Sequence, residues 1–569
     1  MRLREMVLNS TGTYIPPDGG GADFAYTDGS EVEKTLLDVV MRASDRTSCS
    51  AELKAGIVDW PTRYHLSPSR CNLLRPLSEI RGEASVLELG CGCGALTRYL
   101  GETCRHVDAV EGSAMRARIT RERCIDLKNV RVHVANFLDL EFEREYDVVT
   151  LIGVLEYAAI YSAGKPVSRD DPFLAVLRLA QSALKDDGVL VLAIENQIGL
   201  KYWAGCKEDH TAVIFHGIHG YPMEGGGKPG PETFSRRALR DLLRKAGLDF
   251  ADFYFPLPDY KLPHSVIADG EAVRDGKLYL HNWWATGFDD LREQRAYLFS
   301  EPLASRTICR AGLMGEMANS FLVVASMKET GASRSASAAT AAGGLPWIAR
   351  RYSTERRPCY ATETTMYEAD REVRVCKRLL HPGAPHGNGS GFRVKELDEK
   401  WQPGDLLLYR FYEAFMDRQD VVARLLSEMA ALNELLVRLK GKGTKDEEGY
   451  PLLDGSAFDF GPWNVVDMDG RHMPIDDEWE SDGEFAIDYI MYRCMHNVMS
   501  WMQGYLAANG QVSPGPEALD QAVLELLRAL YPGYNEARHK KNMILERRTQ
   551  EYLHGLCEWD HEAAVLGAA

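Results

Sequence analysis

The chain has 569 residues, too many for a single hydrophobic core, and this length favours two to four domains, of which we expect two. Its 66 Lys and Arg residues are outnumbered by 83 Asp and Glu residues, which gives a formal charge of -17. A surface of that sign repels nucleic acid, and we therefore expect no nucleic-acid partner.

The N-terminal stretch MRLREMVLNSTG has no apolar core like that of a signal peptide. No run reaches the ~18 apolar residues that a membrane-spanning helix needs. The 12 cysteines show no paired metal spacing and are expected to be reduced. These features predict a cytoplasmic protein, with peripheral association at the inner face of the plasma membrane left open.

The first part of the chain alternates short apolar runs with helical patterns. Such runs, separated by amphipathic segments of ten to twenty residues, predict a parallel sheet with helices on both faces. The runs are SVLELG (85–90), HVDAVEG (106–112), VRVHVAN (130–136), YDVVTLIG (146–153) and GVLVLAIEN (188–196).

Polar or flexible residues follow each of the first four runs. Gly90, Gly92 and Gly94 follow the first, and glycines at such a turn let a ligand approach the main chain closely. Glu111 ends the second run, where a carboxylate accepts hydrogen bonds from ribose hydroxyls. Asn136 and Phe137 suit the edge and face of an adenine ring, and Gly153 ends the fourth run; these three residues complete the predicted binding edge.

This series resembles the class I S-adenosylmethionine (SAM)-dependent methyltransferases over residues 60–327. The resemblance implies a Rossmann-like α/β domain spanning residues 1–327, with Glu111 holding the ribose of SAM and the three glycines lying under its methionine part. The segment YHLSPSR (64–70) resembles the one that covers the cofactor in related enzymes. We therefore add Tyr64, His65 and Arg70 to the predicted cofactor site.

Polar, aromatic and titratable residues crowd the segment after the fifth run, as an acceptor pocket requires. We assign the acceptor site to Glu195, Asn196, Tyr202 and His210, with His210 as a candidate general base. An ordinary loop with a capped helix is the alternative. The Pro-rich stretch 256–263 is expected near the same opening or as a rigid turn, and the insertion 264–314 is expected to form a lid or a docking surface.

The segment 328–344 is rich in Ala, Ser, Gly and Thr and reads as a linker. After it, strand patterns precede helices, which predicts an α+β domain over residues 345–569 with a strand-rich lobe and a helical lobe. The predicted strands are 346–352, 359–369, 371–379 and 405–415. A long amphipathic helix is predicted over 418–441.

The stretch FDFGPWNVV places Asp459 and Asn464 five residues apart, with Pro462 between them. PIDDEWE follows and places Asp476 twelve residues after Asn464. This order resembles the catalytic and metal-binding loops of the protein-kinase-like fold, especially its aminoglycoside and small-molecule branches. The resemblance implies that Asp459 orients the acceptor hydroxyl and that Asn464 and Asp476 bind Mg²⁺ beside ATP.

The cation for the ATP phosphates is assigned to Lys377 in the third predicted strand, with Arg350 and Arg351 as competitors. Three features depart from the kinase pattern. No glycine-rich loop occurs between 347 and 366, Ala457 stands where protein kinases have His, and little chain remains for a helix carrying the carboxylate partner of Lys377.

The pair of domains resembles the bifunctional kinase/methyltransferases that terminate O-antigen polysaccharides of Gram-negative bacteria. The resemblance implies phosphorylation of a terminal sugar and methylation of that phosphate, with a glycan or glycolipid acceptor and a glycosyltransferase or polymerase complex as partner. The long C-terminal coiled coil of those enzymes is missing here. The alternatives are methylation of a sugar hydroxyl or carboxylate beside an independent small-molecule kinase, or beside a silent nucleotide-binding scaffold.

Overall fold

The computed structural model describes most of the chain. The predicted linker, 328–344, falls outside the described residues except for its first two positions. The described ranges are 1–19, 29–161, 168–222, 230–288, 295–329, 347–385, 391–417, 419–468, 470–513 and 515–557.

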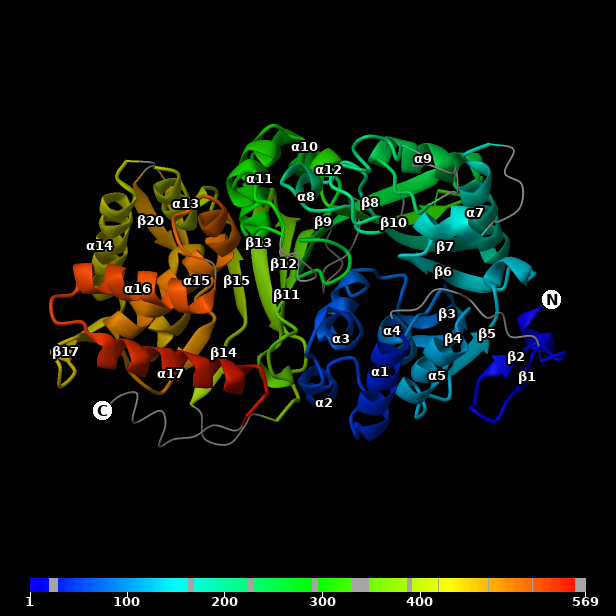
Figure 1. Ribbon diagram of the computed structural model, residues 1–569, viewed down its shortest axis with the longest axis horizontal. Coiled ribbons are helices and arrows are strands. Elements are labelled where there is room, and N and C mark those ends of the chain that lie inside the picture. Colours follow the sequence, from blue (N-terminus) through cyan, green and yellow to red (C-terminus); the bar gives the residue numbers. More distant parts are fainter. Residues whose placement is uncertain are drawn as a thin grey trace.

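One sheet runs through both halves of the molecule (Figure 1). Fourteen strands are hydrogen bonded side by side in it. In spatial order they are β1 (Val7–Leu8), β2 (Tyr14–Ile15), β5 (Val130–Val134), β4 (Cys104–Glu111), β3 (Gly82–Leu89), β6 (Tyr146–Ile152), β7 (Leu184–Glu195), β10 (Ser320–Ser326), β8 (Phe250–Leu257), β9 (Ser265–Ala268), β11 (Trp347–Tyr352), β12 (Thr362–Ala369), β13 (Glu372–Leu379) and β15 (Leu397–Lys400).

The strands β5, β4, β3, β6 and β7 are parallel, as the apolar runs predict. Successive side chains point to opposite faces of a strand, so Leu87 packs with one core and Val86 with the other. The helices α7 (Asp171–Ala183) and α9 (Arg236–Lys245) cover the face of Leu87. Helix α4 (Ala95–Thr103) covers the opposite face. Burial on both faces explains why these runs are continuously apolar.

Further helices of this half surround the sheet and its carboxyl edge (Figure 1). They are α1 (Ser30–Arg42), α2 (Ala51–Ala55), α3 (Trp60–Leu66), α5 (Ala114–Arg123), α6 (Ala158–Tyr161), α8 (Leu200–Trp203), α10 (Glu271–Asp275), α11 (Glu301–Arg310) and α12 (Met314–Met317). A short 3-10 helix, Pro68–Leu73, follows α3.

The described parts of the insertion 264–314 join the two halves. Its strand β9 pairs with β8 on one side and with β11 on the other. The tyrosine hydroxyls of Tyr409 and Tyr412 donate to the carbonyls of His281 and Ala285, both at 3.0 Å. The insertion is therefore built into the C-terminal half.

In the C-terminal half, strands β11 to β16 precede the first α-helix, but strands β17 to β22 follow helix α14, so the predicted order holds only in part. The predicted strand 405–415 is wrong. Only Asp405–Leu406 is strand (β16), whereas Leu408–Met416 is helix α13. Leu408, Phe411, Tyr412 and Phe415 are buried at the i, i+3, i+4, i+7 spacing of one helix face. Aromatic residues such as Tyr409, Phe411 and Tyr412 are common in strands, so the composition of this segment favoured a strand prediction over the helical period.

The helices α14 (Val421–Lys440), α15 (Ile487–Ala508), α16 (Pro516–Leu530) and α17 (Glu536–Leu553) complete this half, at the left of Figure 1. The predicted amphipathic helix is present as α14, with Leu425, Met429, Leu432 and Leu436 buried and Val422 and Leu439 exposed. No described helix is long and apolar enough to cross a membrane. The small strands are β14 (Phe392–Val394), β17 (Gly441–Lys445), β18 (Pro451–Leu453), β19 (Val465–Met468), β20 (Arg471–Pro474), β21 (Trp479–Ser481) and β22 (Phe485–Ala486).

Candidate functional site

A glycine turn leaves strand β3 and begins helix α4. Gly90, Gly92 and Gly94 have φ angles of 80°, 56° and 77°, a region that favours glycine. A Cβ atom on Gly94 would lie 2.9 Å from the Cα of Thr120, so glycine is also required there by close packing. The turn thus brings main chain to the carboxyl edge of the sheet, as the sequence predicts.

Glu111, at the end of β4, faces this turn. Its carboxylate accepts hydrogen bonds from the main-chain N–H of Gly92 at 2.8 Å and of Ser113 at 3.0 Å. Two oxygens offer about four acceptor positions, so two remain for a ligand. The side chain is held in place by the backbone and open to the cavity.

A cavity of about 360 Å³, the first cavity, lies over the carboxyl ends of β3, β4, β5 and β6. Ten of the residues that the sequence predicts for the cofactor and acceptor line it together. They are Tyr64, His65, Arg70, Gly90, Gly92, Glu111, Asn136, Phe137, Gly153 and His210.

Arg70 fixes the segment that covers the first cavity. Its guanidinium donates to the main-chain carbonyls of Tyr260 and Lys261, both at 3.0 Å, and to the hydroxyl of Tyr64 at 2.8 Å. The cation also lies 4.5 Å from the centre of the Tyr64 ring. Arg70 therefore joins the predicted covering segment, 64–70, to the stretch 256–263 at one wall of the first cavity.

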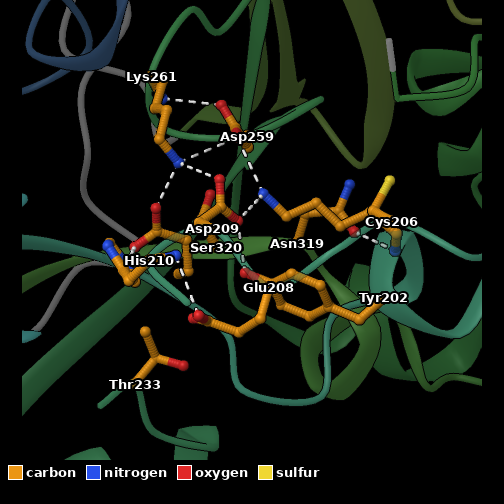
Figure 2. Close-up of polar contacts among 12 residues, drawn as sticks. Tyr202, Cys206, Glu208, Asp209, His210, Thr233, Asp259, Lys261, Asn319 and Ser320 are labelled. Carbon is orange, nitrogen blue, oxygen red and sulfur yellow. Dashed lines mark hydrogen bonds and ion pairs between the residues drawn. The ribbon is translucent and has the colours of Figure 1, made fainter. Parts of the chain in front are cut away.

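A cluster of buried charges forms the acceptor side of the first cavity (Figure 2). The ammonium of Lys261 contacts the carboxylates of Glu195 and Asp209, the latter at 2.9 Å. Lys201 lies 2.7 Å from Asp209 and 3.3 Å from Asp259. Buried charges are stable only when paired in this way, so the pairing fixes the position of Lys261 at the cavity wall.

The four predicted acceptor-site residues have different positions. His210 lines the first cavity, and Glu195 lies directly behind it with 3.3 Å between Nε2 and the carboxylate. Tyr202 and Asn196 do not line the cavity. The hydroxyl of Tyr202 donates to Asp209, and the amide of Asn196 donates to the carbonyls of Glu316 and Ala318. The structure thus gives Asn196 and Tyr202 supporting positions.

The charges around His210 oppose the predicted role of general base. Burial acts to lower its pKa, but the negative charge of Glu195 and their hydrogen bond outweigh burial and raise the pKa to about 9. At neutral pH the imidazole is therefore protonated. It presents a cation at the cavity wall, together with the ammonium of Lys261.

Two buried acids also line the first cavity. Glu88, in the middle of strand β3, and Glu156, in the 3-10 helix Leu155–Tyr157, are each almost fully buried with one carboxylate oxygen lacking a hydrogen-bond partner. Burial raises the pKa of each to about 8. Sequence reasoning placed the segment around Glu156 at the carboxyl edge of the sheet but missed Glu88, whose only signal is an acid among residues that are otherwise apolar.

Residues 63–251 match the family model of a methyltransferase domain. The spatial order β5-β4-β3-β6-β7-β10-β8, with β10 antiparallel to its neighbours, agrees with that match. This part of the chain is therefore similar to a methyltransferase domain. Most residues that line the first cavity lie within this matched range, and Trp60, Tyr260 and Lys261 lie just outside it.

Solved structures give a distant likeness confined to part of the chain. NodS, an N-methyltransferase from Bradyrhizobium japonicum in complex with S-adenosylhomocysteine, is 21% identical over 27% of this chain and 75% of its own, with a TM-score of 0.21. A SAM-dependent methyltransferase from Aquifex aeolicus is 18% identical over 34% of this chain and 86% of its own, with a TM-score of 0.22. A search of curated proteins gives no significant match.

Outside the methyltransferase domain, a second cavity of about 350 Å³ brings together the kinase-like residues of the prediction. Lys377, Asp459, Asn464 and Asp476 all line it, although they are up to about a hundred positions apart in sequence. The amide nitrogen of Asn464 donates to the main-chain carbonyl of Asp459 at 2.8 Å and to its carboxylate at 3.2 Å. This leaves the amide oxygen of Asn464 for another ligand.

The buried carboxylate partner of Lys377, left open by the sequence, is Glu478. Lys377 contacts Asp476 and lies 2.8 Å from Glu478, which also binds Arg356 at 2.9 Å. Burial acts to raise the pKa of Glu478, but the charges of Arg356 and Lys377 lower it to about 2. A carboxylate two residues after Asp476 thus pairs with Lys377.

The competitors of Lys377 have different positions. Arg351 lines the second cavity, whereas Arg350 pairs with Glu363 at 3.6 Å and does not line it.

The insertion of the methyltransferase half contributes to the second cavity. His264, Asn282, Trp283 and Thr286 line it beside the kinase-like residues. Because Lys261 and His264 are three residues apart, their Cα atoms lie within about 11 Å of each other, although they line different cavities. The cavities are therefore neighbours across one short stretch of chain.

Hydrogen bonds also join the covers of the two cavities. The carboxylate of Glu355 accepts from the hydroxyls of Ser67 and Ser69, both at 2.6 Å. Ser67 and Ser69 belong to the segment that covers the first cavity, and Arg356, next to Glu355, lines the second. The chain between β11 and β12 is thus joined to the methyltransferase half by side-chain hydrogen bonds.

Proposed function

We propose that the protein is a bifunctional enzyme that phosphorylates a sugar at the end of a bacterial surface polysaccharide, of the O-antigen kind, and then methylates that phosphate. The donors are ATP with Mg²⁺ and SAM. The observation that carries this proposal is the pair of neighbouring cavities, each lined by the residues that one donor requires. The acceptor is a glycan or glycolipid, presented by its polymerising enzymes.

The first cavity fits SAM. Glu111 has acceptor positions left for the ribose hydroxyls, and Phe137 and Asn136 suit the adenine ring. Glu88 has an unpaired buried oxygen, which a methionine ammonium group would pair and ionise. When bound, SAM supplies the methyl group from its sulfonium. The chain's contribution is to orient both reactants and to exclude water.

The acceptor wall of the first cavity favours an anion over a neutral hydroxyl. His210 is protonated at neutral pH, and Lys261 lies beside it with its ammonium held by Glu195 and Asp209. A phosphate monoester needs no base before it is methylated, because it is already ionised, whereas a sugar hydroxyl does. The cations of His210 and Lys261 at this wall therefore suit phosphate methylation better than hydroxyl methylation.

The second cavity fits phosphoryl transfer. Burial raises the pKa of Asp459, the charge of Arg493 opposes that rise, and the carboxylate lies beside Asn464. Asn464 and Asp476 would hold Mg²⁺, which neutralises charge on the transferred phosphoryl group, and Lys377 would contact the phosphates. Asp459 would accept the proton of the attacking sugar hydroxyl.

The test is to incubate the protein with ATP, Mg²⁺, methyl-labelled SAM and a synthetic oligosaccharide. We expect methyl label on the sugar only when ATP is present, and mass spectrometry to show a methyl phosphate ester. Label incorporation that is indifferent to ATP would refute the coupled reaction and favour methylation of a hydroxyl or carboxylate. Binding of ATP and Mg²⁺ without turnover would favour a nucleotide-binding scaffold.

A further inference from the structure

One face of helix α15 is turned toward the second cavity. Arg493, Asn497 and Trp501 follow one another at intervals of four residues, which places them on one side of a helix, and all three line the cavity. Asp459 lines the same cavity, with its carboxylate 3.5 Å from Arg493 Nη2. The helix thus presents two polar groups and one indole ring beside the predicted catalytic carboxylate.

A second indole ring meets Trp501 at this place. Trp463 lies between Pro462 and Asn464 of the motif, and its ring centre is 5.2 Å from that of Trp501 at an angle of 73°. Trp501 is 37% exposed although it is apolar and aromatic. Two large rings at the wall of a cavity offer an apolar surface whose exposure to water is unfavourable.

Arg493 supplies an unsatisfied donor at the same wall. The residue is only 8% exposed, yet its Nη1 atom has no hydrogen-bond partner among the described residues. A buried donor without a partner costs free energy, which a ligand hydroxyl at this wall would recover. The combination of apolar rings and a hydrogen-bond donor matches a molecule with apolar C–H faces and a polar edge.

We propose that Trp463, Trp501, Asn497 and Arg493 form the subsite that binds the pyranose ring of the acceptor. The indole rings contact the C–H face of the sugar, and Asn497 and Arg493 bind its hydroxyl groups. The subsite directs one hydroxyl at Asp459. This inference rests on the proposed kinase function and specifies which residues recognise its acceptor.

The position favours the sugar over the adenine ring of ATP. In phosphoryl transfer the attacking and leaving oxygens are in line, so the acceptor lies beyond the catalytic carboxylate, away from the rest of the donor. Lys377 and Asp476 mark the donor side. Trp463 lies four residues after Asp459 along the chain, and Arg493 contacts Asp459 directly. These residues therefore belong to the acceptor side.

The test measures sugar binding without catalysis. In Asp459→Asn protein without ATP, saturation-transfer NMR with the methyl glycosides of glucose, galactose and mannose should show signal concentrated on the C–H protons of one ring face for at least one of them. Adding Trp501→Ala should reduce that signal several-fold, and Trp501→Phe should restore most of it. Absence of signal before the tryptophan is changed, or an unchanged signal after Trp501→Ala, would overturn the subsite.

Kinetics separate this proposal from the proposed function. In otherwise unaltered protein, Trp501→Ala should raise the KM for the oligosaccharide about tenfold and leave the KM for ATP unchanged. Val422→Ala, an exposed position on α14 that does not line the cavity, is the control and should change neither. A rise in the KM for ATP alone would overturn the subsite. Absence of any phosphorylation by the unaltered protein would instead refute the kinase, while the NMR result would still decide the sugar subsite.

Discussion

The two cavities differ in how the chain builds them. The first lies at the carboxyl edge of a parallel sheet, and most of its ligand-facing residues come directly after consecutive strands. The second is assembled from the insertion of the methyltransferase half, the strands β11 to β15 and the C-terminal helices. In the first cavity the order of the strands determines where the functional residues lie. In the second cavity, tertiary contacts between distant segments determine their positions.

This difference has a consequence for how the sites depend on each other. The second cavity contains His264 and Trp283 from the methyltransferase half, and the cover of the first cavity is hydrogen bonded to Glu355 from the C-terminal half. Each half therefore supports the site of the other. Variants that disable one reaction without disturbing this shared framework are the sharpest way to compare the two sites.

The largest effect is expected for Asp459→Asn. Loss of the carboxylate that accepts the sugar proton should lower phosphoryl transfer about 100- to 10,000-fold. Methyl transfer to an unphosphorylated oligosaccharide should fall with it, whereas SAM affinity and methyl transfer to a chemically phosphorylated acceptor should be unchanged. Assays with labelled ATP and labelled SAM measure both. If methyl transfer to the unphosphorylated acceptor survives Asp459→Asn, the methyl-transfer reaction does not depend on phosphorylation.

A smaller effect, on stability as well as rate, is expected for Glu478→Gln. Without the charge of Glu478, Lys377 and Arg356 share a buried site with less compensation, which should cost about 2–4 kcal/mol of unfolding free energy. Phosphoryl transfer should fall because Lys377 is no longer fixed. Thermal unfolding and initial rates measure these changes.

The matched control for Glu478 is its neighbour Asp477. Asp477→Asn removes the same charge from a side chain that is 44% exposed and pairs with Lys395 and Lys440. It should alter stability by less than about 1 kcal/mol. Equal effects of the two variants would show that Glu478 has no special role.

The smallest effect is a pH dependence confined to the first cavity. The pKa of His210 is raised from 6.5 to about 9, so its positive charge persists through neutral pH and is lost as the pH rises through about 9. The KM for the phosphorylated acceptor should rise up to about tenfold between pH 8 and 10, and this rise should depend on His210. His210→Gln should have a higher KM at pH 7 and a flatter profile.

Glu156 provides the control for this pH dependence, since burial raises its pKa to about 8 in the same cavity. If Glu156→Gln removes the pH dependence and His210→Gln leaves it intact, the cation assigned to the acceptor site is wrong. NMR titration of the His210 imidazole gives its pKa directly.

The sequence predicts the first cavity well because its signals are local. Glycines after a strand and an acid after the next strand are fixed by strand order, so Gly90, Gly92 and Glu111 could be placed without knowing the rest of the fold. Glu88 could not, because its position at the cavity depends on which side of the strand faces the ligand edge. The same uncertainty applies to Asn196, which does not line the cavity.

The second cavity is predictable only in its motif. Asp459, Asn464 and Asp476 lie within eighteen residues, and Lys377 was assigned from the resemblance, with Arg350 and Arg351 as competitors. Glu478, Arg356 and Trp283 enter through tertiary packing, which no local spacing encodes. The helix at 408–416 was misread because its aromatic residues suit strands equally well, and only burial reveals their helical period.

We propose that one chain binds two different adenosine-containing donors in neighbouring cavities. In a calorimetric titration, S-adenosylhomocysteine and a non-hydrolysable ATP analogue with Mg²⁺ are added in either order. We expect one site for each ligand, with the second binding retained after the first is saturated. Heat from only one ligand, or displacement of one by the other, would show that the chain does not bind both donors at separate sites.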